Sequence, residues 1–454
     1  MTSQTETRRR AAPRPEGATD GGARQLWLRV LFDPAGTLDD RLVEVPRSGL
    51  VIGRDEGVDL RLGDGLSSRR HASIVGQRGG GFRVEDLGSA NGTLCNRAPV
   101  QRAALRDGDV LRIGDTVLLA LAEASGAWLE DDGLLGRSAA MQRLHAQIER
   151  VGPLGLPVLV RGPTGSGKEL VAGALHRRSG RRGTFVPVNS AALPGELVES
   201  ALFGHRKGAF THATADAEGA FRAAHRGTLF LDEIGDMPLL LQPRLLRALE
   251  AGEVTPVGAS LPIPVDVRVV AATHVDLEAA VAQGRFREDL LARVAAVELE
   301  VPALAARKDD LLRLATALLP EEAPRPRWSA DVVEALASWG WPRQVRELRN
   351  VMARLGLLAE GTGPWGLADL PRAMRMPPHA ATAEAATTTD APGAPGVVPA
   401  DDDAPAVELE GPPDRATLLA LLDEADGNVS ELARRVGRSR KQVYRWLHAH
   451  GIER

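Results

Sequence analysis

Short apolar runs separated by Gly, Asp and Asn residues fill the first quarter of the chain. They occupy residues 26–31, 42–45, 50–52, 72–75, 82–84, 110–113 and 117–121. This rhythm is typical of an all-β sandwich or barrel. We therefore expect a β-rich domain over residues 25–124. The polar, Pro/Gly-containing residues 1–24 show no period and are predicted to form a disordered tail.

The pattern then changes to apolar strands that each precede a helix-compatible stretch. The strands are predicted at residues 158–160, 185–188, 229–231 and 267–271. This alternation predicts an α/β subdomain with a mostly parallel sheet over residues 134–301. Beyond residue 301 no strand pattern returns. Helices expected at 311–319, 330–339 and 345–358 predict an all-helical lid over residues 302–375.

The remaining chain divides into a linker and a compact helical segment. Residues 376–412 are rich in Ala, Pro, Thr and Asp, which is typical of a flexible linker. Residues 413–454 show helical periodicity again, with apolar positions Val429, Leu432, Ala433 and Val436 on one face. Ser439 and Gln442 form a capping-box pattern at the start of a last helix.

Composition narrows the class of protein. A length of 454 residues suggests about three domains of about 150 residues each. The net charge of −4 gives no global basic field, so a nucleic-acid contact needs a local patch. Cys95 is the single cysteine, which excludes an internal disulfide framework. With no signal-peptide core and no membrane-spanning run, we expect a cytoplasmic protein without a membrane partner.

A phosphate-binding loop follows the strand at 158–160. Its glycines allow backbone N–H groups to curl round phosphate oxygens, the following helix adds its positive end, and Lys168 neutralises charge. A chance Gly-rich turn is the alternative. The predicted nucleotide-contacting residues are Gly162, Pro163, Thr164, Gly165, Ser166, Gly167, Lys168 and Glu169. Glu169 stands where the general motif has a Ser or Thr ligand for Mg²⁺.

An acidic pair ends the strand at 229–231. Taken alone, such a pair is usually a solvated strand end. Beside a phosphate-binding loop it is suited to hold Mg²⁺ through Asp232 and to polarise the attacking water through Glu233. The sequence therefore predicts a site for ATP and Mg²⁺.

Residues 134–360 resemble the AAA+ activators that work on sigma-54 RNA polymerase. The matching stretches are 162–169, 185–189, 199–205, 227–234, 284–290 and 341–348. The resemblance implies an ATPase that forms ring-shaped homo-oligomers, usually hexamers, with ATP between subunits.

The resemblance also implies roles for further residues. Arg287 and Arg293 would be arginine fingers that reach the neighbouring subunit's nucleotide; a solvated helix face is the alternative for both. Arg346 would be the sensor II arginine of the lid, and Thr273 and His274 would occupy the sensor I strand end. Asn189 would pair with Glu233 as a nucleotide-dependent switch.

A loop at residues 208–213 matches the family's sigma-54-contacting loop. Phe210 and Thr211 would make that contact with the holoenzyme. His212 stands where the family carries a second glycine, and a non-glycine residue resists backbone conformations that glycine adopts. A client other than sigma-54 is therefore the alternative.

The β-rich domain resembles a forkhead-associated (FHA) domain over residues 26–122. The resemblance is carried by Arg54, Ser68, Arg69, His71 and Asn91. It implies a β-sandwich whose loops read phosphothreonine: Arg54, Ser68 and Arg69 suit a phosphate. Asn91 would bond the ligand backbone, and His71 would brace the loop. A solvated charge, a turn hydroxyl and a hairpin turn at Asn91-Gly92 are the plain alternatives.

Residues 413–454 resemble the Fis-type helix-turn-helix of many such activators. The predicted DNA-contacting residues of the last helix are Arg440, Lys441, Gln442, Tyr444 and Arg445. A protein-docking three-helix unit is the alternative, which the concentration of arginines disfavours.

These observations predict a sigma-54-dependent activator that binds enhancer DNA upstream of a promoter and hydrolyses ATP to open it. The FHA domain would connect it to a partner phosphorylated on threonine by a kinase, in place of a phospho-acceptor receiver. The rivals are an ATPase with another client and a non-catalytic DNA-binding regulator.

Overall fold

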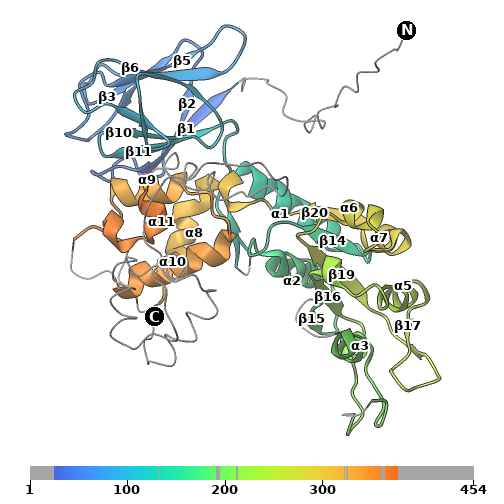
Figure 1. The fold of residues 1–454 in the computed structure, drawn as a ribbon. Coiled ribbons are helices and arrows are strands. Elements are labelled where there is room, and N and C mark those ends of the chain that lie inside the picture. The colour runs from blue at the N-terminus through green and yellow to red at the C-terminus, as the bar shows by residue number, and fades with distance from the viewer. Residues whose placement is uncertain are drawn as a thin grey trace, which may run out of the picture. The chain divides into compact units, whose positions relative to one another are not determined.

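The computed structural model describes residues 25–131, 133–190, 195–210, 213–321, 323, 326–358 and 363–376 (Figure 1). The chain divides into two units, 1–388 and 389–454, and every described residue belongs to the first. The predicted tail, nearly all of the linker, Thr211 and the predicted helix-turn-helix lie outside the described residues.

The first domain is a sandwich of two sheets, which decides between the predicted sandwich and barrel. One sheet has the order β2-β1-β11-β10-β7-β8 and the other β4-β3-β5-β6-β9. All neighbouring strands are antiparallel except β3 and β4. The strands are β1 Leu26–Phe32, β2 Leu42–Val45, β3 Leu50–Gly53, β4 Leu60–Arg61, β5 Ala72–Gly76, β6 Phe82–Asp86, β7 Thr93–Cys95, β8 Ala98–Val100, β9 Arg102–Leu105, β10 Val110–Ile113 and β11 Thr116–Leu121.

The apolar runs predicted the long strands within one or two residues. The short strands β4, β7, β8 and β9 were not predicted, since each has too few apolar residues to make a run. The two sheets enclose a core in which Leu28, Ile52 and Val84 are fully buried. Alternate strand positions face this core, as expected of a sandwich.

Cys95 lies at the end of β7 and is 8% exposed. Burial, with Asp109 nearby, raises the pKa of its thiol to about 11. At pH 8 about one thiol in a thousand is then ionised, and the thiolate is the reactive form. We expect native protein to react with a maleimide at least about 100-fold more slowly than denatured protein. Equal rates would show that β7 opens freely. Because Cys95 is the single cysteine, mass spectrometry reads this site alone.

The second domain contains a parallel five-stranded sheet of order β15-β16-β19-β14-β20, as predicted. Its strands are β14 Val158–Arg161, β15 Phe185–Asn189, β16 Thr228–Asp232, β19 Arg268–Thr273 and β20 Val297–Glu300. Strand β20 was not predicted, because its alternating residues lack a continuous apolar run. Two small hairpins accompany the sheet: β12 Leu129–Asp131 with β13 Leu134–Gly136, and β17 Glu253–Val254 with β18 Ile263–Pro264.

Helices cover both faces of this sheet, as the alternation of buried residues requires. Phe230 and Val270 pack with α1 and α2, whereas their neighbours Leu229 and Val269 pack with α3, α5, α6 and α7. The helices are α1 Ala139–Val151, α2 Lys168–Arg178, α3 Gly195–Phe203, α4 Ala220–Ala223, α5 Gln242–Ala251, α6 Leu277–Ala282 and α7 Glu288–Val294, with the 3₁₀ helix η1 Ile234–Asp236.

Helices are the regular secondary structure of the lid over its described residues, as predicted. It contains η2 Leu304–Ala306, η3 Lys308–Asp310, α8 Leu311–Ala317, α9 Ala330–Ser338, α10 Gln344–Leu358, η4 Leu367–Asp369 and α11 Arg372–Arg375. Trp341 and Trp365 are fully buried at its centre.

The lid shares its apolar core with the sandwich, which the sequence did not predict. Leu31, Val110, Val117 and Leu119 of the sandwich belong to the same buried cluster as the lid helices. Helix α9 contacts β1, β10 and β11 (Figure 1). Arg29 donates to Asp309 at 2.9 Å, and Lys308 donates to the carbonyl of Gly108 at 2.7 Å. The sandwich and lid are therefore packed together. The sheet that packs against the lid is β2-β1-β11-β10-β7-β8, and not β4-β3-β5-β6-β9.

Within the described part of the chain, no helix has both the length and the apolar character needed to cross a membrane.

Candidate functional site

The phosphate-binding loop joins β14 to α2, as the sequence predicted. Gly162, Gly165 and Gly167 all have positive φ, at 152°, 83° and 106°. A Cβ at Gly165 would lie 2.7 Å from the carbonyl oxygen of Arg343, so this close approach of loop and lid requires glycine. A pocket of about 830 Å³ beside the loop is lined by Gly162, Pro163, Thr164, Thr273, His274 and Pro342, among others.

Lys168 begins α2 and is largely buried. Its Nζ donates to the carbonyl oxygen of Gly162 at 3.1 Å and lies 3.4 Å from Oε1 of Glu233. A buried ammonium with a single carboxylate partner at that distance suits an additional anionic ligand. Glu169, next along the helix, is exposed.

The acidic pair lies at the carboxyl end of β16, where ligands of open parallel sheets bind. Burial, followed by the neighbouring charge of Glu233, raises the pKa of Asp232. The buried hydroxyl of Ser166 in the loop has no hydrogen-bond partner among the described residues. A half-buried carboxylate and an unpaired hydroxyl beside glycine N–H groups fit Mg²⁺ and a phosphate group.

Glu233 is held in a strained backbone conformation. Its φ and ψ are 52° and 51°, in the left-handed region that non-glycine residues avoid. Burial raises the pKa of this carboxyl, but the hydrogen bond with His274 and the charge of Lys168 outweigh it, so the pKa is lowered. The carboxyl is thus an anion near neutral pH, as a base must be.

His274 is the contact of Glu233 that sequence reasoning missed. Its Nδ1 lies 2.7 Å from Oε2 of Glu233, and its backbone N–H donates to the same oxygen at 3.3 Å. The resemblance placed His274 only at the end of β19.

Thr273 is the last residue of β19 and is buried, and its hydroxyl accepts from the N–H of Val275 at 3.0 Å. Asn189 lies in register with Asp232 on the neighbouring strand, and its pairing with Glu233 stays a prediction.

The predicted arginine fingers lie on or next to α7, and both are exposed. This segment is far in sequence from the phosphate-binding loop. Arg287 precedes the helix and pairs with Asp289 at 2.7 Å; Arg293 donates to the carbonyl of Leu249 at 3.1 Å. Arg346 is exposed on α10, and its Cβ lies 3.2 Å from the point that a Cβ on Gly165 would occupy. The lid thus brings the predicted sensor II arginine to the loop.

Arg307 is a second residue that sequence reasoning missed. It is buried, and its guanidinium donates to the carbonyl oxygen of Ser166 at 3.1 Å. Asp310, three residues on, accepts from Ser138 at the start of α1 at 2.7 Å. No sequence pattern distinguishes Arg307 from a solvated arginine.

Phe210 of the predicted sigma-contacting loop lies against His205, with ring centroids 4.8 Å apart at an edge-on angle of 63°. Nδ1 of His205 lies 2.6 Å from Oγ of Ser200 in α3. The loop base is therefore tied to α3. Thr211 and His212 lie outside the described residues.

The predicted phosphopeptide residues gather at the loops that follow β3, β4 and β6. His71 is buried; its Nδ1 accepts from the N–H of Ser68 at 3.0 Å and its Nε2 lies 3.1 Å from the carbonyl of Gly92, as a loop brace would. Oγ of Ser68 accepts from the N–H of Ala90 at 3.0 Å. Arg54, Arg69 and Asn91 are exposed beside them.

Asn91-Gly92 does not form the type I′ hairpin turn considered as an alternative. That turn needs positive φ at both residues, and only Gly92 has it. The side-chain amide of Asn91 donates to the carbonyl of Leu66 at 2.7 Å, which connects two of the loops. The predicted DNA-contacting residues Arg440, Lys441, Gln442, Tyr444 and Arg445 lie outside the described residues.

Family models match most of the chain. The FHA domain model matches residues 50–114, the sigma-54 interaction domain 134–300 and the AAA+ ATPase lid domain 305–387. A winged helix-turn-helix model matches residues 415–453, so the Fis type stays a prediction.

Several curated proteins are similar to this chain. The transcriptional regulatory protein ZraR of Escherichia coli is 40% identical over 71% of this chain and 70% of its own length. The DNA-binding transcriptional regulator NtrC of Azospirillum brasilense is 49% identical over 50% of this chain and 48% of its own. The chain spans about half the length of the NtrC proteins it matches.

A solved structure supports the same relationship. The crystal structure of NtrX from Brucella abortus in complex with ATP is 32% identical, with a TM-score of 0.50 over 70% of this chain and 68% of that one. Taken with ZraR, these matches place the chain in the family of sigma-54-dependent transcriptional regulators, with an FHA domain ahead of its AAA+ domain and a helix-turn-helix segment after its lid.

Proposed function

We propose that this protein is an ATP-hydrolysing transcription activator that opens promoters held by the sigma-54 RNA polymerase holoenzyme. The observation that carries the proposal is the meeting of Lys168, Asp232 and Glu233 at the carboxyl edge of the sheet. Family membership supports the client, since the matching domain is a sigma-54 interaction domain.

The residues of the site would have separate roles in binding ATP and in hydrolysing it. Glycine N–H groups and Lys168 would bind the phosphates of ATP, and Asp232 would hold Mg²⁺, which supplies further neutralising charge. Glu233, already ionised, would orient a water molecule and accept its proton. Its present bonds to His274 and Lys168 occupy both carboxylate oxygens, so at least one must release for that role.

Hydrolysis would depend on ring assembly, with a hexamer expected. Arg287 and Arg293 are exposed, so each can reach a neighbouring subunit. An arginine supplied across an interface stabilises transition-state charge, and an isolated subunit would lack it. Asn189 would report nucleotide state to the loop of Phe210 and Thr211, which would contact sigma-54.

The remaining domains would supply location and control. Enhancer DNA upstream of the promoter would be contacted by Arg440, Lys441, Gln442, Tyr444 and Arg445. Arg54, Ser68, Arg69 and Asn91 would bind a protein phosphorylated on threonine by a kinase. The exposed guanidinium groups beside a fixed Ser68 hydroxyl support this reading.

Promoter opening on a supercoiled template tests the motor and its client together. We expect opening by sigma-54 holoenzyme to require ATP, this protein, and both Lys168 and Thr211. Lys168→Ala should lose hydrolysis and opening, because the phosphate charge is no longer neutralised. Thr211→Ala should keep hydrolysis and lose opening. Hydrolysis without opening by the unaltered protein, even on pre-melted DNA, would support the alternative of another client, which His212 motivates.

A further inference from the structure

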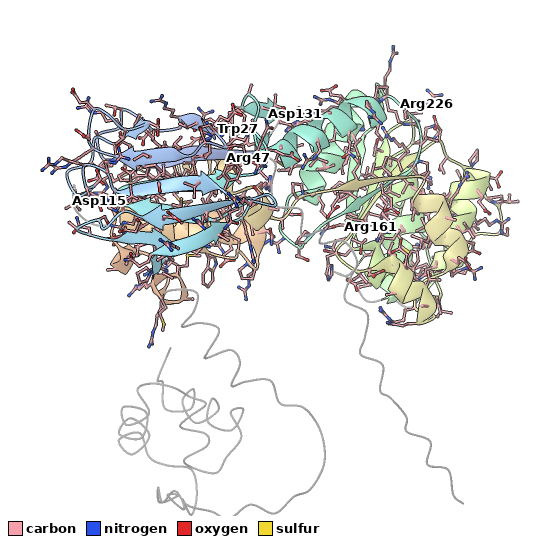
Figure 2. All side chains as sticks on the ribbon, turned by 90° about the horizontal axis from the view of Figure 1, so that it is seen from above. Trp27, Arg47, Asp115, Asp131, Arg161 and Arg226 are labelled. Atoms are coloured by element: carbon pink, nitrogen blue, oxygen red, sulfur yellow. The ribbon has the colours of Figure 1, made fainter. Side chains whose placement is uncertain are left out.

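A buried carboxylate links the predicted phosphopeptide loops to the other sheet of the sandwich. Asp64 precedes Ser67 and Ser68; its carbonyl accepts from the Ser67 hydroxyl at 2.7 Å, and Oδ1 accepts from the N–H of Leu66 at 2.8 Å. Its other carboxylate oxygen accepts from the N–H of Asp115, in the turn between β10 and β11 (Figure 2). The position of this loop is therefore fixed against that turn.

Arg112 connects the same turn to the lid. Its guanidinium donates to Oδ1 of Asp115 at 2.8 Å and, through Nε, to the carbonyl of Gly114 at 2.9 Å. It also donates to Asp331 at 2.5 Å and Glu334 at 3.3 Å, in the first two turns of α9. Its side chain is 17% exposed and that of Glu334 is 5% exposed, so water screens this pair weakly, whereas Asp331 is 54% exposed.

Glu334 makes this link sensitive to small displacements. Its side chain is 5% exposed, and one carboxylate oxygen has no partner among the described residues. Burial raises the pKa of Glu334, and Arg112 opposes that rise. Moving Arg112 away would leave a buried carboxylate unpaired, which is strongly unfavourable. A shift in the turn is therefore expected to move α9 with it.

The segment that follows helix α9 approaches the phosphate-binding loop. The indole of Trp341, just after this helix, donates to the carbonyl of Leu336 at 3.1 Å, and Gln344 donates to the carbonyl of Trp341 at 2.9 Å. The next residues approach Gly165, where the carbonyl of Arg343 and the Cβ of Arg346 leave no room for a side chain. A continuous series of contacts thus runs from the loop at Ser67 to the loop at Gly165.

We propose that Arg112 couples phosphopeptide binding at the sandwich loops to nucleotide binding at the phosphate-binding loop, through Asp64 and Asp115 on one side and helix α9 on the other. This rests on the phosphothreonine-reading function proposed above and names how that site regulates the motor. Coupling between two binding sites is reciprocal, so nucleotide changes peptide affinity by the same factor that peptide changes nucleotide affinity.

Fluorescence polarisation on the full chain measures this factor. The probe is the tightest member of a phosphothreonine-peptide library, titrated with and without ATPγS and Mg²⁺. We expect ATPγS to change the peptide Kd of the unaltered protein at least about fivefold. Arg112→Gln and Asp331→Asn should each reduce that ratio toward one, and the double variant should lower it no further than Arg112→Gln alone.

Two controls separate this coupling from other effects. Arg102→Gln, a matched change at an exposed arginine of the other sheet, should keep the full ratio. The domains should stay docked in Arg112→Gln, because the shared apolar core and the Arg29–Asp309 pair remain. Peptide binding that ignores ATPγS in the unaltered protein, or full coupling in Arg112→Gln, would overturn the proposal.

Hydrogen exchange distinguishes failure of the coupling from failure of the reader function. If no phosphothreonine peptide binds better than its unphosphorylated form, the reader function is wrong. Amide exchange at residues 64–69 then still decides whether Arg112 connects this loop to the nucleotide site. ATPγS should change that exchange in the unaltered protein and not in Arg112→Gln; equal changes in both would refute a role for Arg112.

Discussion

Replacing Glu233 with glutamine should lower the rate of ATP hydrolysis by about 10²–10⁴-fold, the usual contribution of a positioned base. The amide is nearly isosteric but cannot accept the proton of the attacking water. Nucleotide binding should persist, because Lys168 and the glycine loop are unchanged. Phosphate release measures the first effect, and the fluorescence of a methylanthraniloyl-ATP analogue measures the second.

Glu218→Gln is the matched control for this change. Glu218 is exposed and lies 3.9 Å from Arg222, outside the nucleotide site. Replacing Glu218 should leave the rate of hydrolysis within about twofold of the rate of the unaltered protein, as for surface substitutions away from specific interactions. Hydrolysis by Glu233→Gln at a rate close to that of this control would show that another group activates the water.

Arg287→Ala should lower hydrolysis by about 10³–10⁵-fold, the effect reported for arginine fingers. Arg287 is exposed, and its one described ion-pair partner is the adjacent Asp289, so the loss of its side chain should not disturb the fold. Arg285→Ala, two residues away and also exposed, should retain activity.

Mixing two inactive variants tests whether Arg287 acts on a neighbouring subunit. Arg287→Ala keeps an intact nucleotide site, whereas Lys168→Ala keeps an intact arginine. If the arginine acts across the interface, mixed rings contain some complete sites and activity returns on mixing. No recovery in rings shown to be mixed by native mass spectrometry would assign Arg287 a role within its own chain.

The chemistry of the nucleotide site could be predicted because it is carried by short contiguous motifs. A strand, a glycine loop and Lys168 follow one another in sequence, and Asp232 ends a continuous apolar strand. Parallel strands then bring these ends to one edge of the sheet. The sandwich was predictable for a similar reason, since its long strands are apolar runs bounded by turns.

The contacts that could not be predicted join residues far apart in sequence. His274 meets Glu233 only because β19 lies beside β16. Arg112 and Arg307 are single arginines among many, and their roles arise from burial against segments that lie about 140 to 220 residues away in the chain. The short strands of the sandwich were missed because backbone pairing, rather than side-chain pattern, defines them.

The shared core between sandwich and lid limits how this domain arrangement can be recombined. The face of α9 that bears Val332 and Val333 is buried in a cluster that includes Leu31 and Val117 of the sandwich. Exchanging the sandwich alone would expose apolar surface on the lid, which promotes association. Evolution and protein engineering would therefore have to transfer the N-terminal domain and the surface of α9 as one unit.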